Sequence, residues 1–203
     1  MGIVTADISV TLDGYGAGQN QRLEAPFGDL DPDPLHSWMF EHADESAVEV
    51  AAITEATAYI MGRNMFSPQR GEWDLEWKGW WGEDPPYHAP VFVLTHHDRA
   101  PVPMKGGTTF NFVTDGIASA LEQARVAAGS GNVAIAGGAT TINQYLGVGL
   151  IDELRLHVVP VTGGISGGSR IFDGVPLIEF DVVAARHTPH VTHLTCVRQG
   201  LRQ

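Results

Sequence analysis

The sequence has a single cysteine, Cys196, among its 203 residues. An intramolecular disulfide is therefore excluded, and a reducing compartment suits the chain. Cys196 lies within the apolar run 194–197, which predicts a buried strand residue and not a nucleophile.

Long hydrophobic runs are also missing. None of the apolar runs approaches the roughly 20 residues that a membrane helix needs. Residues 1–7 lack the basic segment and the long apolar core of a signal peptide. These absences predict a cytoplasmic protein without a membrane partner.

Basic residues are scarce, with 12 Lys and Arg against 24 Asp and Glu, and they form no cluster. A nucleic acid or an anionic membrane surface requires such a cluster, so both are disfavoured as partners. A dinucleotide stays compatible with the formal charge of −12, because helix N-termini and a few local cations can bind its phosphates.

The residues that are present predict one folded domain over residues 1–203, with 43% hydrophobic and 18% charged side chains. Strand and helix patterns alternate in the first half, and strands dominate the last third. The first helix is predicted over residues 35–43, with Asp33 as N-cap and Pro34 in its first turn. A second helical stretch is predicted over residues 46–57.

A long segment without helix or strand patterns covers residues 67–89 and holds four of the five tryptophans. Four large apolar side chains need a place to be buried, so this loop is predicted to be ordered.

The strongest functional motif is the junction at Gly137 and Gly138, where an apolar strand meets a helix that starts at Ala139. Glycines let a ligand approach the backbone, and free N–H groups at a helix start suit a phosphate. Thr140 and Thr141 add hydroxyl groups. A tight turn that binds nothing would show the same residues.

Two other predicted strands end in similar residues: Gly62 and Arg63 follow one, and Thr95 and His96 follow the other. Ligands of open α/β sheets bind at the carboxyl ends of strands, and arginine can grip a phosphate with two hydrogen bonds. The convergence favours a ligand site, although a surface arginine after a capping glycine would look the same.

The first strand runs into a glycine-rich loop that carries Asp13, Tyr15, Gly16 and Ala17. Such a loop can close over a substrate, and Asp13 can orient a polar substrate group or a water. A simple turn at Asp13 is the alternative.

The sequence predicts no metal site. His187, His190 and His193 recur every three residues, but in a strand that spacing turns neighbouring members to opposite faces. A Cys/His ligand set, a Walker loop and a G-x-S-x-G motif are all absent from the sequence.

With these motifs the chain resembles the dihydrofolate-reductase-like proteins related to the reductase domain of the bacterial riboflavin-biosynthesis deaminase-reductase. The resembling stretches follow the expected order along nearly the whole chain: residues 8–17, 58–66, 90–97, 134–154 and 169–174. The resemblance implies a three-layer α/β fold, with a mainly parallel central sheet, antiparallel C-terminal edge strands and helices on both faces. It also implies a homodimer and NADPH lying across the strand ends.

The resemblance assigns roles to particular residues. The implied cofactor-binding residues are Gly16, Ala17, Gly62, Arg63, Thr95, His96, Gly137, Gly138, Ala139, Thr140 and Thr141. Asp13 and Tyr15 would face the substrate as catalytic residues, and Trp38 and Phe66 would bind it.

The chain departs from true dihydrofolate reductases near Trp38. Those enzymes carry a buried acid one turn before a tryptophan of the first helix, whereas Leu35, His36 and Ser37 stand here. We therefore expect a small-molecule substrate other than dihydrofolate, and the tryptophan-rich loop favours an apolar, ring-containing one.

The leading hypothesis is an NADPH-dependent reductase that transfers a hydride to a C=N or C=O group. A reductase that uses a deazaflavin or flavin is one alternative. A non-catalytic nucleotide-binding protein that kept the fold is another, because fold alone does not fix function.

Overall fold

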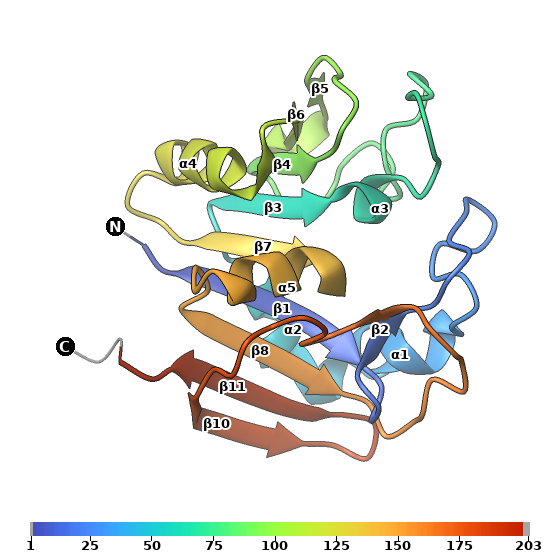
Figure 1. Cartoon of the computed structure of the whole chain (residues 1–203), viewed down its shortest axis with the longest axis vertical. Coiled ribbons are helices and arrows are strands. Elements are labelled where there is room, and N and C mark those ends of the chain that lie inside the picture. The colour runs from blue at the N-terminus through green and yellow to red at the C-terminus, as the bar shows by residue number, and fades with distance from the viewer. Residues whose placement is uncertain (1, 201–203) are drawn as a thin grey trace.

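A computed structural model describes residues 2–200 of the chain (Figure 1). Its strands are β1 (Val4–Val10), β2 (Tyr15–Ala17), β3 (Ala58–Gly62), β4 (Pro90–Leu94), β5 (Val102–Pro103), β6 (Thr109–Val113), β7 (Val133–Gly137), β8 (Glu153–Val158), β9 (Ser169–Arg170), β10 (Phe180–His187) and β11 (Thr192–Arg198). Its helices are α1 (Pro32–Phe40), α2 (Ala47–Ile53), α3 (Arg63–Phe66), α4 (Gly116–Ala128) and α5 (Ala139–Gly147), with 3-10 turns η1 (Ala43–Ser46) and η2 (Lys105–Gly107). In the described part of the chain, no helix is both long and apolar enough to cross a membrane.

Nine strands form one sheet in the order β10-β11-β8-β1-β7-β3-β4-β6-β5. The six strands from β8 to β6 in this order run parallel to one another. β11 and β10 extend the sheet antiparallel at one edge, and β5 does so at the other. The predicted parallel sheet with antiparallel C-terminal strands is therefore confirmed.

The two faces of the sheet bury different side chains, because neighbouring residues of a strand point to opposite sides. Ile60 of β3 joins a core with residues of α4 and α5. Its neighbours Tyr59 and Met61 join a second core on the other face, which the loop of residues 67–89 closes.

Helix α1 lies on the same side of the sheet as this loop, opposite α4 and α5. Its Trp38 packs on His157 of β8, with ring centroids 4.6 Å apart. The flanking Leu156 belongs to the core of α4 and α5 and so points to the other face. Helices therefore cover both faces, as the resemblance implies.

Helix α1 begins and ends three residues earlier than the predicted helix over residues 35–43, and its N-cap lies two residues earlier than predicted. Asp31, not Asp33, is the N-cap: its side chain accepts a hydrogen bond of 3.1 Å from the backbone N–H of Asp33. Pro32 then occupies the first helical position in place of Pro34. The alternation of Asp and Pro offers two equivalent starts, and the sequence pattern did not distinguish them.

The predicted helix over residues 46–57 is shorter in the structure, because α2 ends at Ile53. The backbone N–H of Thr57 donates to the carbonyl of Asn132 instead of continuing the helix. Extended backbone is needed at this point to enter β3, which begins at the next residue.

The loop of residues 67–89 contains no helix or strand, yet it is packed as predicted. Trp73 is buried, and Trp77 and Trp81 pack partly buried against the second core. Arg99 stabilises the loop, because its guanidinium donates hydrogen bonds to the carbonyls of Leu75 at 3.0 Å and Trp77 at 2.7 Å.

Candidate active site

Three of the predicted segments meet at the edge where the parallel strands end (Figure 1). Gly137 of β7 pairs with Met61 of β3, and Gly62 pairs with Leu94 of β4. Arg63 and Thr95 directly follow those strands and so lie at the same edge. The convergence expected from the sequence is present in the fold.

Gly62 has a packing role at this edge. A Cβ atom added there would lie 2.4 Å from Oγ1 of Thr141 on α5. Such an approach is closer than van der Waals contact allows, so glycine lets the start of α5 lie against β3. The residue supports the site through packing, separately from its implied contact with a cofactor.

Gly62→Ala is expected to destabilise the fold by about 1–2 kcal/mol, because the added methyl group overpacks the contact with Thr141. The free energy of unfolding is measured with urea. In the Thr141→Ala background the same substitution should cost much less, since Oγ1 is absent. An equal cost in both backgrounds would contradict this packing role.

Gly138 has the opposite surroundings. A Cβ atom added at Gly138 meets nothing within 4 Å, so the backbone there borders open space. Gly137 before it has φ +124°, a conformation that favours glycine. The two glycines thus leave an open cradle directly before α5.

The start of α5 is electrostatically suited to an anion. Its first turn carries no acidic residue, and its N-cap, Gly138, has no side chain to occupy the free N–H groups. Those N–H groups and the helix dipole attract negative charge. Together with the open space beside Gly138, they form a cradle that suits a phosphate or pyrophosphate.

Arg63 directly follows β3, the strand beside β7, and its Nε is buried without a hydrogen-bond partner. Its guanidinium lies over the ring of Trp73 at 4.0 Å and donates to the carbonyl of Gly71. Burial and, to a lesser degree, the nearby Arg70 lower the pKa of the Arg63 guanidinium. An anionic group near the guanidinium would offset the cost of burying this positive charge.

Thr95 and His96 differ in what they can offer a ligand. Thr95 is buried, and its hydroxyl accepts a hydrogen bond of 3.1 Å from the backbone N–H of His97, which closes the turn after β4. His96 is exposed. Trp73 Nε1 donates to the carbonyl of His97 at 2.8 Å, so the tryptophan-rich loop is fixed at this strand end.

The loop after β1 is anchored through Asp13. Its carboxylate accepts hydrogen bonds from Oγ1 of Thr11 at 2.6 Å and from the backbone N–H of Gly163 at 2.8 Å. The bond from Thr11 and then the one from Gly163 lower the pKa of Asp13. A carboxyl group with a lowered pKa is ionised at neutral pH, so Asp13 suits an orienting role better than proton donation.

The short strand β2 brings the next residues to the cradle. β2 pairs with β9, and a Cβ atom at Gly16 would lie 3.8 Å from Cβ of Ala139, the first residue of α5. Tyr15 is mostly buried, and the guanidinium of Arg170 lies 5.2 Å from its ring. The structure thus brings Gly16 close to the first residue of α5.

Trp38 and Phe66 occupy different places from those predicted. Both side chains are fully buried. Trp38 Nε1 donates to Oγ of Ser9 at 3.0 Å, and Phe66 packs edge-on against Trp73, Phe110 and Phe112. A fully buried side chain presents no surface to a ligand, so we assign both residues to the core and not to a substrate site.

A buried polar cluster that the sequence analysis missed lies beneath α1. His157 Nδ1 and His193 Nδ1 share a hydrogen bond of 2.8 Å, and His193 Nε2 is 3.1 Å from Oγ of Ser46. His157 Nε2 faces the carboxylate of Asp7 at 3.7 Å. The chain positions of these residues are far apart, so only their apolar strand context could have indicated burial.

Comparisons with known proteins agree with this architecture. The family model of the RibD C-terminal domain matches residues 3–197. No curated protein matches the sequence. Among solved structures, a putative riboflavin biosynthesis protein from Shewanella sp. PV-4 is 23% identical, with a TM-score of 0.64 over 97% of this chain and 99% of that one.

Two further structures share the fold at lower identity. RibD of Acinetobacter baumannii is 15% identical with a TM-score of 0.58, and the match covers 98% of this chain but 58% of that one. Dihydrofolate reductase from Enterococcus faecalis, solved with NADP(H), is 13% identical with a TM-score of 0.56, over 97% of this chain and 96% of that one. The fold is therefore dihydrofolate-reductase-like.

Proposed function

Because the chain belongs to the family of the RibD C-terminal domain, we propose that it is an NADPH-dependent reductase acting on a C=N or C=O group of a small, ring-containing substrate other than dihydrofolate. The observation that carries the proposal is the open cradle at Gly137 and Gly138, which lies at the same strand edge as Arg63. Relatives with this fold include RibD and a dihydrofolate reductase solved with NADP(H).

The cofactor would be held mainly by backbone groups. The N–H groups at the start of α5, from Gly138 to Thr140, suit the pyrophosphate, and Arg63 suits a phosphate on the adenosine side. The exposed His96 would meet a 2′-phosphate, and Gly16 and Ala17 would cover the nicotinamide. When bound, NADPH supplies the hydride.

The protein's own contribution is positioning and the exclusion of water. The ionised carboxylate of Asp13 fixes the loop after β1 through Thr11 and Gly163, and so holds Tyr15 and β2 beside the cradle. We propose that the proton reaches the substrate from water or from Tyr15, with Asp13 in an orienting role.

Titration of the purified chain with NADPH and NADH tests the proposal by calorimetry and by tryptophan fluorescence. We expect NADPH to bind with a dissociation constant in the micromolar range. Arg63→Ala should weaken NADPH binding about tenfold, which corresponds to the loss of one charge-assisted hydrogen bond. Trp73 fluorescence should respond, because Arg63 stacks on that ring.

Arg186→Ala is the matched control, since it removes the same charge from β10 at the far edge of the sheet. It should bind NADPH like the parent. Failure of the parent protein to bind either nicotinamide cofactor would refute the proposal. Binding of a reduced deazaflavin or flavin in that case would identify the alternative cofactor.

A further inference from the structure

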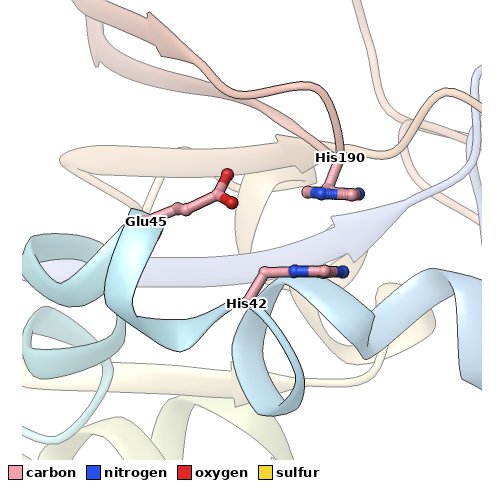
Figure 2. Close-up of side chains that lie close together, drawn as sticks. All are labelled: His42, Glu45 and His190. Atoms are coloured by element: carbon pink, nitrogen blue, oxygen red, sulfur yellow. The ribbon is translucent and has the colours of Figure 1, made fainter.

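A second group of chemically active side chains lies apart from the strand-end site. His42 follows α1, Glu45 belongs to η1, and His190 lies in the turn between β10 and β11. One possible ligand atom from each of the three residues lies within 4.8 Å of the others. Figure 2 shows the two imidazole rings one above the other, with the Glu45 carboxylate turned toward them.

The backbone fixes the positions from which these side chains project. The N–H of Glu45 donates to the carbonyl of His42 at 3.1 Å, so both residues leave the same turn. The N–H of His190 donates to Oγ1 of Thr188 at 3.1 Å, which orders the opposite turn. Arg186 joins the two parts by donating to the carbonyl of Glu45 at 2.8 Å.

The side chains themselves are uncommitted. Within residues 2–200, the side chains of His42, Glu45 and His190 make no hydrogen bond and no ion pair. The two imidazoles are half-buried and stack with centroids 3.6 Å apart and planes 4° from parallel. Their nitrogens and the exposed carboxylate are therefore available to a ligand from solvent.

We propose that His42, Glu45 and His190 bind a divalent transition metal ion of the zinc class. Imidazole nitrogen and carboxylate oxygen are ligands that such ions prefer, and three protein ligands leave a position for water. Bonds of about 2.0–2.1 Å place tetrahedral ligand atoms about 3.3 Å apart, whereas the ligand atoms here lie within 4.8 Å of one another, so the three side chains must draw together and the two rings must rotate to direct their nitrogens at one ion. The rings leave their parallel stack to do so, which their partial exposure permits.

The surrounding charge favours a cation at this place. Glu41 and Asp44 are next to the proposed ligands His42 and Glu45 in the sequence. The neighbouring Arg186 is held by the carboxylate of Glu49, to which its guanidinium donates. The segment thus presents carboxylates while its nearest positive charge is paired.

A metal here joins two parts of the fold that are distant in sequence. It connects the end of α1 to the hairpin of β10 and β11, the antiparallel edge of the sheet. Because binding stabilises the folded state only, the ion is expected to raise the melting temperature. This site is independent of the proposed reductase activity.

Calorimetric titration of the full chain with zinc chloride, after treatment with a chelator, tests the site. We expect one ion per chain and a rise of several degrees in melting temperature. His42→Ala, His190→Ala and Glu45→Gln should each weaken binding at least about tenfold. Cobalt(II) bound to the parent protein should give the visible absorption of a site with a low coordination number. This absorption should be absent when cobalt(II) is added to these variants.

His187→Ala is the matched control, because His187 is exposed on the same hairpin but outside the cluster. It should bind zinc like the parent. Circular dichroism confirms that each variant is folded. The site is disproved if the parent does not bind zinc, or if His42→Ala and His190→Ala bind it as the control does.

Discussion

Gly138→Val is expected to abolish NADPH binding while leaving the fold intact. A Cβ atom added at this position meets no protein atom within 4 Å, so the substitution should cost little stability. It would fill the cradle before α5 and keep a pyrophosphate from the N–H groups there. Losing two charge-assisted hydrogen bonds of about 1.5–3 kcal/mol each weakens binding at least about a hundredfold.

Gly147 offers a matched comparison at the other end of α5. A Cβ atom added there also meets nothing within 4 Å. Calorimetry on Gly138→Ala and Gly147→Ala, beside the valine variant, separates the cradle from a general effect on the helix. If all three variants bound NADPH with the affinity of the parent protein, the cofactor would have to bind elsewhere.

Acidification is expected to destabilise the protein through the histidine pair beneath α1. Burial first, and then the neighbouring His157, lowers the pKa of His193 to about 4. An unfolded histidine titrates near 6.5, so between these values the unfolded state binds more protons and stability falls as the pH falls. Allowing for screening by solvent, we expect a loss of about 2 kcal/mol between about pH 7 and about pH 4.5.

The hydrogen bond between the two Nδ1 atoms, which are 2.8 Å apart, adds to this effect of burial. One of them must accept, and a second proton removes the acceptor. Urea unfolding at several pH values measures the loss, and His193→Gln should flatten the curve in this window. Burial also lowers the pKa of His36, so His36→Gln serves as the comparison and should keep most of the dependence. An unchanged curve in His193→Gln would contradict this origin.

The parts of the fold that depend on local pattern were predictable from the sequence. The apolar stretch before Gly137 and the helix after it agree with β7 and α5. β3 likewise ends at Gly62 as expected. In these cases a continuous apolar run predicts the strand and the following glycine predicts where it ends. Neither depends much on residues that are distant in the sequence.

The features that the sequence did not reveal depend on distant contacts. β2 and β9 have three and two residues, too few for an alternation of apolar and polar side chains to be recognised. Each is a strand only because it pairs with the other. Trp38 has an amphipathic ring that suits either a pocket or a core, and its bond to Ser9 determines the choice. The candidate metal ligand His190 meets His42 only because β10 and β11 close the sheet beside α1.

The strand order has a consequence for how the chain is made. β1 is synthesised before the other strands of this sheet, but its two neighbours, β7 and β8, begin only at Val133 and Glu153. β3 pairs with β4 on one side but also waits for β7 on the other. Until residue 137 has been synthesised, the middle of the sheet is absent and apolar strand edges stay exposed. Nascent chains of this protein therefore depend on late closure of the sheet, which is slow and favours chaperone binding.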